Sequence, residues 1–174
     1  DGDGMDNTDA HMAFGRHATS KLTRDDDLFF INTMGFRGEA LPSIASVSEV
    51  FLKTSNGNDS TFLHLKGGEV LEDKAGDLRR GTDIIVTNLF YNTPARLKYL
   101  KSENTELYNC ENLIEKLALS RPDIKFTLTN KERVLIRTSG SNELLKTIHE
   151  IYGLNVSNKM LEFKASNNDF DIYG

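Results

Sequence analysis

The feature of this sequence that most constrains its fold is a turn framed by Gly35 and Gly38, which leads directly into an apolar helix pattern from Glu39 to Val47. Several backbone N–H groups of such a turn can point at one phosphate, and the helix start adds the positive end of its dipole. Arg37, between the glycines, can contribute either its guanidinium or only its backbone N–H. Glu39 is best interpreted as a partner of the helix dipole, because a carboxylate facing phosphates would repel them.

Two further segments suit a nucleotide. The loop Thr19-Ser20-Lys21 combines two hydroxyls with a cation, which fits a polyphosphate but also occurs in ordinary loops. Gly2 and Gly4 allow close approach of a base or phosphate to the backbone. The dinucleotide fingerprint fails because Asn7 stands where its third glycine would be, and no P-loop pattern occurs. A nucleotide site here would therefore be of neither common kind.

The remaining pattern consists of short strands and helices. Helices are predicted over residues 6–16, 39–47, 105–120 and 143–152, with another that begins with Thr93 as cap and Pro94 at its first position. Strands are predicted over residues 49–54, 61–66, 69–72, 82–90, 124–129 and 133–138, with β-like segments near Val156 and at 160–164. This order predicts an α+β fold with a mixed sheet.

Composition narrows the class of protein. The 174 residues, 38% hydrophobic and 27% charged, suit one globular domain or one domain plus part of another. The single cysteine, Cys110, excludes an internal disulfide and favours a reducing compartment, and no histidine has metal-ligand spacing to it. The net charge is −6 over residues 1–87 and +1 over residues 88–174. Phosphate-backbone binding is therefore expected in the second half, where Arg96, Lys98 and Lys101 form either a binding cluster or a solvated helix face.

Six short segments occur in a fixed order over about residues 1–101. They are Gly2-x-Gly4, residues 16–21 (R-H-A-T-S-K), residues 35–41 (G-F-R-G-E-A-L), residues 43–47 (S-I-A-S-V), Gly81-Thr82 and residues 89–96 (L-F-Y-N-T-P-A-R). In this order they resemble the N-terminal ATPase region of MutL-type DNA mismatch repair proteins. That family belongs to the Bergerat (GHKL) superfamily, together with type II topoisomerase ATPase domains, chaperones and histidine kinases.

The resemblance implies an incomplete Bergerat-type ATPase α/β sandwich over residues 1–140, truncated at its N-terminus. Residues 141–174 would begin a domain similar to ribosomal protein S5 domain 2, truncated at its C-terminus. Gly2 and Gly4 would lie near the adenine, Thr82 would line its pocket, Thr19-Ser20-Lys21 would form a lid, and residues 35–41 would wrap the phosphates. The implied ATP-binding residues are Gly2, Gly4, Thr19, Ser20, Lys21, Gly35, Phe36, Arg37, Gly38, Glu39, Ala40, Leu41 and Thr82.

The same resemblance places the catalytic and metal-binding residues outside this sequence. On a strict count, which matches Gly2 and Gly4, the adenine-binding Asp of the family falls immediately before Asp1, whereas a loose count makes it Asp1. The water-activating Glu and the Mg²⁺-binding Asn would lie on a helix further upstream. The implied cofactors are ATP and Mg²⁺, but no catalytic or metal-binding residue is assigned within the chain. The chain alone is therefore expected not to hydrolyse ATP.

The function implied by the resemblance is that of an ATP-gated dimeric clamp linking mismatch recognition to strand removal. Its implied partners are a MutS-type mismatch recognition protein, DNA, a downstream nuclease and helicase, and a second copy on ATP binding, with no membrane. Its location would be the bacterial cytoplasm with the nucleoid, or the nucleus of a eukaryote. Two alternatives stay open, namely a topoisomerase-like or chaperone-like ATPase domain, which the string at 90–96 argues against, and a structural domain that binds no phosphate.

Overall fold

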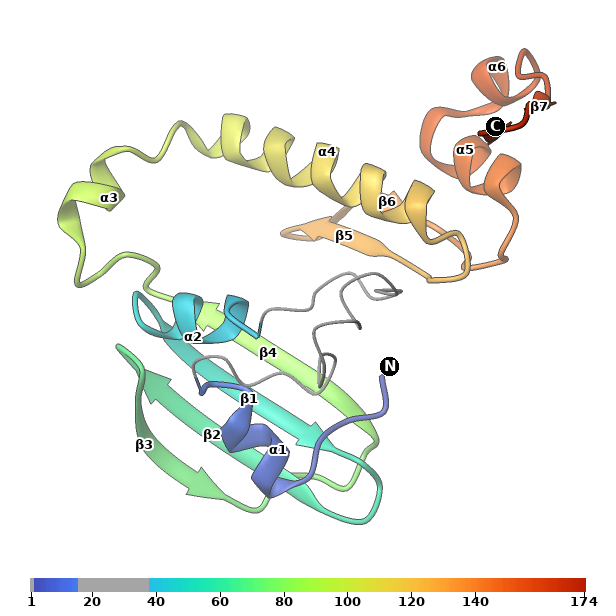
Figure 1. Cartoon of the computed structure of the whole chain (residues 1–174). Helices are drawn as coiled ribbons and strands as arrows, with labels where there is room; N and C mark the ends of the chain where they lie inside the picture. The colour runs from blue at the N-terminus through green and yellow to red at the C-terminus, as the bar shows by residue number, and fades with distance from the viewer. Residues whose placement is uncertain (1, 16–37) are drawn as a thin grey trace. The chain divides into compact units, whose positions relative to one another are not determined.

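The computed structural model describes residues 2–15 and 38–174, and the chain forms two compact units, Asp1–Leu100 and Lys101–Gly174 (Figure 1). The six predicted site residues Thr19, Ser20, Lys21, Gly35, Phe36 and Arg37 lie outside the described residues. The division into an ATPase domain over residues 1–140 and a second domain from residue 141 stays a prediction.

The first unit is built on a four-stranded sheet. Its strands are β1 (Glu49–Ser55), β2 (Ser60–Lys66), β3 (Glu69–Lys74) and β4 (Gly81–Thr87), in the order β3-β2-β1-β4. Each neighbouring pair is antiparallel, so the prediction of a mixed sheet is wrong for the described strands. The short links explain this for β1, β2 and β3, because four residues join β1 to β2, Gly67-Gly68 joins β2 to β3, and a parallel pair needs a much longer crossover.

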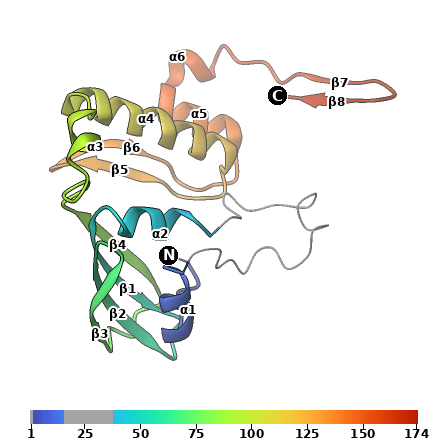
Figure 2. The same cartoon turned by 60° about the vertical axis from the view of Figure 1, so that its left-hand side comes forward.

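One face of this sheet carries the core of the first unit. Alternate residues of β1 and β2 point to this face, and Val50, Leu52 and Leu63 are fully buried there. Ala10 of helix α1 (Asn7–Met12) and Ala45 of helix α2 (Ala40–Ala45) join the same cluster. Two short helices therefore cover this face of the sheet (Figure 2).

The other face carries a polar cluster that ties the start of β1 to the residues after β4. His64 stacks on Phe51, with ring centroids 4.4 Å apart, and its Nε2 lies 2.8 Å from the Glu49 carboxylate. Asn88 donates a second hydrogen bond of 2.9 Å to that carboxylate. The bonds from His64 and Asn88 favour the ionised form, so the pKa of Glu49 lies below its usual value.

The second unit combines two larger helices with small antiparallel hairpins. Its elements are α4 (Glu103–Ser120), β5 (Thr127–Asn130), β6 (Arg133–Arg137), α5 (Leu144–Tyr152), α6 (Leu154–Ser157), β7 (Lys164–Ser166) and β8 (Asp171–Tyr173). Ser102 caps α4, and the Tyr152 hydroxyl donates to Glu115 over 3.2 Å. Buried Ala118 and Ile136 come from α4 and β6.

Several predicted element types and ends differ from the structure. The segment near Val156 is helical rather than β-like, and the strand predicted over 160–164 begins only at Lys164. The strand predicted from residue 124 begins at Thr127, because Ile124 lies in a turn whose N–H bonds the Arg121 carbonyl. Helix α1 ends at Met12 instead of Arg16, in a turn closed by a bond from Gly15 N–H to the Met12 carbonyl.

The segment after β4 departs most from the predicted pattern. β4 ends at Thr87 rather than Phe90, because Asn88 and Phe90 have φ values of 52° and 65°, which a strand does not allow. Pro94 takes the first position of helix α3 (Pro94–Lys98), as predicted. Thr93 precedes it but makes no capping hydrogen bond, and its buried hydroxyl has no hydrogen-bond partner.

Replacing a core leucine tests the assigned core. We expect Leu52→Ala to lower the free energy of unfolding by about 2–5 kcal/mol, since it leaves a cavity under α1 and α2. Leu71→Ala in β3 is the matched control, because Leu71 is 56% exposed and Leu52 is 0% exposed. Urea denaturation, monitored by circular dichroism, measures the free energy of unfolding of both variants. Equal losses of stability in the two variants would contradict the assigned core.

Candidate functional site

The glycine-rich segment at the start of the chain lies against the end of β1. Gly4 has a φ of +73°, and a Cβ placed on it would lie 1.7 Å from the Ser55 carbonyl oxygen. No side chain fits that space, so Gly4 is required both by conformation and by close approach. The next residue, Met5, donates its N–H to the Thr54 hydroxyl over 2.9 Å.

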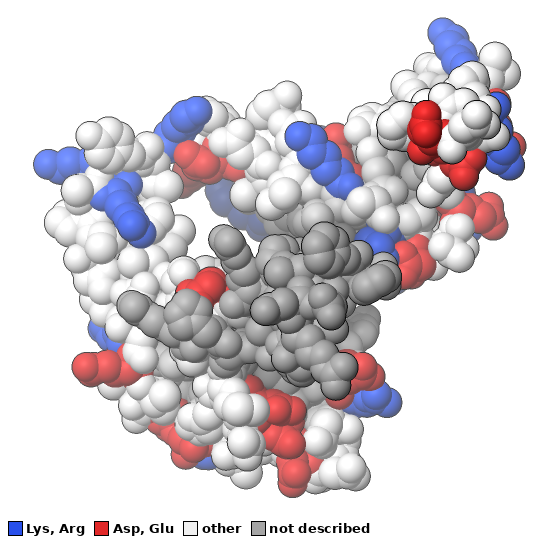
Figure 3. All heavy atoms as spheres, in the orientation of Figure 1, with Lys and Arg blue, Asp and Glu red and all other residues white. Residues whose placement is uncertain are grey.

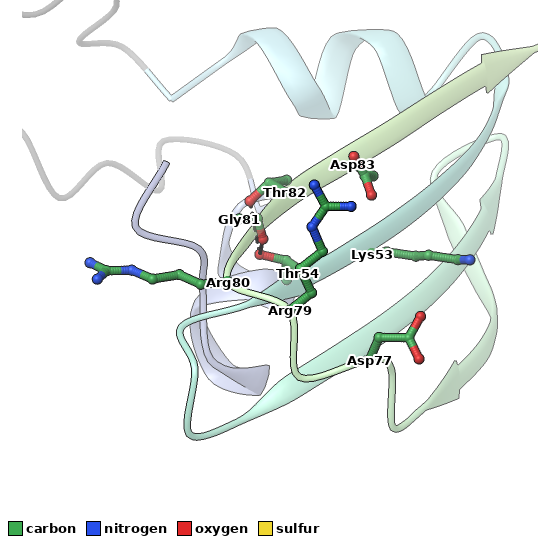
Figure 4. Close-up of a pocket in the computed structure, with 8 residues that line it drawn as sticks. All are labelled: Lys53, Thr54, Asp77, Arg79, Arg80, Gly81, Thr82 and Asp83. Carbon is green, nitrogen blue, oxygen red and sulfur yellow. Dashed lines mark hydrogen bonds between the residues drawn. The ribbon is translucent and has the colours of Figure 1, made fainter. Parts of the chain in front are cut away.

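Thr54 connects this segment to β4. Its hydroxyl lies 2.9 Å from the Thr82 hydroxyl and 3.2 Å from the Gly81 carbonyl oxygen (Figure 4). Thr54 and Thr82 are cross-strand partners of β1 and β4, so their side chains share one face. The structure therefore brings predicted site residues Gly4 and Thr82 together through Thr54, which is only 3% exposed.

An ion pair forms a second link to the glycine-rich segment. The Arg80 guanidinium contacts the Asp3 carboxylate, and its Nε donates to the Asp3 backbone carbonyl over 3.4 Å. Arg79 and Arg80 extend in different directions from adjacent positions (Figure 4). Both partners of the pair are well exposed, and such pairs contribute little to stability. The buried hydroxyl of Thr54 is therefore the stronger anchor.

The described part of the predicted phosphate segment forms the start of α2. Gly38 has a φ of +66°, Glu39 occupies the N-cap position, and Ala40 and Leu41 are the first two helical residues. The helix predicted to follow Gly38 is therefore present, whereas the predicted turn itself includes residues 35–37, which lie outside the described residues. The binding of phosphate by these residues stays a prediction.

The far end of α2 is bound by the segment that follows β4. The Phe90 N–H donates to the Val47 carbonyl over 2.7 Å, and the Asn92 side-chain amide donates to the Ser46 carbonyl over 2.9 Å. Phe90 has a left-handed backbone, and its N–H bonds to the turn that follows α2. The predicted segments at residues 43–47 and 89–96 thus meet at the end of α2, although they are far apart in the sequence.

A small hollow lies beside the hydroxyl cluster, at the ends of β1 and β4 (Figure 4). Its volume is about 140 Å³, and its lining residues are Lys53, Thr54, Asp77, Arg79, Arg80, Gly81, Thr82 and Asp83. Lys53 and Asp83 point to the face opposite Thr54 and Thr82, because successive strand residues alternate. Small-molecule sites usually enclose about 300 Å³ or more. The hollow by itself is therefore not a nucleotide pocket.

Charged side chains are unevenly spread over the face of the molecule that Figure 3 shows. Figure 3 shows acidic side chains gathered over α1 and the sheet of the first unit, and basic ones around α3. Arg96 and Lys98 lie in the last turn of α3, whereas Lys101 belongs to the second unit. DNA binding by this cluster stays a prediction.

Other kinds of site find little support in residues 2–15 and 38–174. No group of three or more His, Cys, Asp or Glu side chains in these ranges is arranged to hold a metal ion. Cys110 is a free, exposed thiol. None of the helices described is long and apolar enough to cross a membrane.

Sequence reasoning missed Thr54 and the ion pair of Arg80 with Asp3. Thr54 lies in an ordinary alternating strand, and its role follows only from the register that places it opposite Thr82. The only signal in the sequence was a threonine at the same alternating positions as Val50 and Leu52. Pairing of Asp3 with Arg80 depends on the path of the chain between β3 and β4, which no local pattern predicts.

The fit of Gly4 against Ser55 gives a direct test. We expect Gly4→Ala to push the segment away from β1, because its Cβ would overlap the Ser55 carbonyl, and to destabilise the chain by about 1–3 kcal/mol. Gly2→Ala is the control, since nothing lies within 4 Å of its Cβ position. Thermal unfolding of both variants measures the difference. A Gly4→Ala variant as stable as Gly2→Ala would contradict the docking of this segment.

Comparison with known proteins places the chain in a family, although no protein-family model matches it. DNA mismatch repair protein MutL of Lactiplantibacillus plantarum is 48% identical over 174 residues, which are 100% of this chain and 26% of that protein. MutL of Bacillus licheniformis is 47% identical over 175 residues, which are 100% of this chain and 28% of that protein. The chain thus spans about a quarter of the length of the curated relatives it matches.

Solved structures agree with the sequence relatives. The Aquifex aeolicus MutL ATPase domain complexed with ADP matches with a TM-score of 0.65 and 29% identity, over 82% of this chain and 55% of that one. The N-terminal domain of a DNA repair protein matches with a TM-score of 0.74 at 23% identity, over 94% of this chain and 49% of that one, which supports the fold alone. These matches confirm the predicted α+β class. On its identity to the curated relatives over its whole length, the chain belongs to the MutL family of DNA mismatch repair proteins.

Proposed function

We propose that this chain forms the part of an ATPase domain that holds the adenine and phosphates of ATP. The observation that carries the proposal is the hydrogen-bonded cluster in which Thr54 joins the Met5 backbone to the Thr82 hydroxyl. It places the glycine-rich segment beside a polar strand end, in a family with a member whose ATPase domain binds ADP.

The residues around this cluster fit a flat base. Nothing lies within 4 Å of the position of a Gly2 Cβ, so space is open beside the segment. The Thr82 hydroxyl supplies a polar atom at its edge. We assign Gly2, Gly4 and Thr82 to the base, Gly35 to Leu41 to the phosphates, and Thr19-Ser20-Lys21 to a lid over them.

Magnesium is part of the proposal for the intact protein only. Mg²⁺ bound to the phosphate oxygens would neutralise charge that develops during phosphoryl transfer. No described residue of this chain is assigned to the ion, and none is assigned as the catalytic base. The proposed contribution of this chain is to bind and orient the nucleotide.

We further propose that the intact protein acts in DNA mismatch repair as an ATP-gated dimeric clamp. ATP would favour the closed dimer by binding it more tightly than the open form. The proposed partners are a MutS-type recognition protein, DNA, a downstream nuclease and a helicase, in the bacterial cytoplasm with the nucleoid. Identity to MutL proteins over the whole chain favours this over a topoisomerase-like or chaperone-like function.

Nucleotide binding by the intact protein that contains this sequence tests the proposal. We expect ADP to bind, and Thr82→Val to raise its Kd about threefold to tenfold through loss of a hydrogen bond. Thr87→Val, at the other end of β4, is the matched control and should leave the Kd unchanged. Isothermal titration calorimetry measures the Kd of ADP for the unaltered protein and for both variants.

Two results would contradict this assignment. One is the absence of ADP binding to the unaltered protein, and the other is an equal loss of affinity in both variants. The clamp is tested separately, by sedimentation with a non-hydrolysable ATP analogue. That analogue should convert monomers into dimers, and a protein that binds it yet stays monomeric would exclude the clamp but not the nucleotide site.

A further inference from the structure

The buried Thr54 hydroxyl has more hydrogen-bond contacts than a single proton can serve. Its oxygen lies 2.9 Å from the Met5 nitrogen, 2.9 Å from the Thr82 oxygen and 3.2 Å from the Gly81 carbonyl oxygen. The Met5 N–H can only donate. The hydroxyl proton must therefore go either to Thr82 or to Gly81.

Only one choice satisfies all three contacts. If Thr54 donates to the Gly81 carbonyl, its oxygen is left to accept from both Met5 and Thr82, and Thr82 becomes the donor. If Thr54 instead donates to Thr82, the contact with Gly81 becomes a repulsion between two acceptors. A carbonyl oxygen has two lone pairs, so Gly81 can accept from Thr54 while it also pairs with β1. Because Thr54 is 3% exposed, water offers little compensation for a lost bond.

This direction of hydrogen bonding determines what Thr82 offers to a ligand. Its single proton is used by Thr54, so its oxygen presents lone pairs only. A group that binds at Thr82 must then donate a hydrogen bond, directly or through a water. A 6-amino purine carries such a donor, whereas a 6-oxo purine presents an acceptor at the same position.

We propose that Thr54 is a positioning residue that contributes to the base specificity of the nucleotide site, through the relay from Thr82 to Thr54 to the Gly81 carbonyl. It does not contact the base itself. The inference rests on the proposed nucleotide function and adds to it the residue that makes Thr82 an acceptor. Any hydroxyl at position 54 that reaches Gly81 should preserve the effect, and an apolar side chain of the same shape should remove it.

The test compares ATP with inosine triphosphate, which carries a 6-oxo group, in the intact protein. Equilibrium Kd values are measured for the unaltered protein, Thr54→Val and Thr54→Ser. Without the Thr54 hydroxyl, the Thr82 proton is free to meet a 6-oxo group, so the preference for ATP should fall about threefold to tenfold in Thr54→Val. Thr54→Ser should keep the preference of the unaltered protein.

Thr61→Val is the matched control. Thr61 is the partner of Thr54 on β2, is equally buried, and accepts a hydrogen bond from Asn7 over 3.3 Å without contacting Thr82. It should leave the ratio of the two Kd values unchanged. A Thr54→Val variant that weakens both nucleotides by the same factor would overturn the proposal and leave Thr54 a purely structural role.

The unaltered protein provides a test that does not depend on the folding of a variant. Purine riboside triphosphate, which has no group at position 6, should bind more weakly than ATP and more tightly than inosine triphosphate. Inosine triphosphate binding as tightly as ATP would overturn the inference while leaving the nucleotide site in place. Binding of none of the three would overturn the proposed function together with this inference.

Discussion

The hydrogen bond from the Met5 backbone to the Thr54 hydroxyl, made next to the close approach of Gly4 to Ser55, holds the start of the chain on the sheet. The exposed pair of Asp3 and Arg80 also links the glycine-rich segment to this strand end, but an exposed ion pair contributes less to stability. The Gly81 carbonyl, which can only accept, takes the Thr54 proton and leaves the Thr54 oxygen to accept from Thr82 as well. One buried hydroxyl thus positions a backbone segment and sets the chemical character of its neighbour on β4.

The antiparallel sheet makes this arrangement possible. Pairing of β1 with both β2 and β4 places three threonines, Thr61, Thr54 and Thr82, side by side on the helix-covered face. The same face continues into the buried leucines at the other end of the strands, where α1 and α2 cover it. A polar end and an apolar end therefore share one surface, so the core supports the candidate site directly.

Most of the described helices and strands of the first unit could be predicted, because the patterns that form them involve residues close together in the sequence. The alternating strands, the helix after Gly38 and the proline at the start of α3 all depend on neighbouring residues. The segment near Val156 was misjudged because its β-branched and apolar residues do not reveal that Gly153 starts a new helix there. β4 was predicted too long because the backbone turns at Asn88 and Phe90, where the Phe90 N–H bonds to the Val47 carbonyl in the turn after α2. Thr54 could not be identified, since its role depends on strand register.

A structure of the intact protein with bound ADP tests the central claim most directly. The account predicts the adenine beside the Gly2–Gly4 segment, with its 6-amino group hydrogen-bonded to the Thr82 oxygen directly or through one water. Thr54 should keep its contacts to Met5, Thr82 and Gly81 in that complex. An adenine bound away from Thr82, or a glycine-rich segment detached from Thr54, would contradict the account.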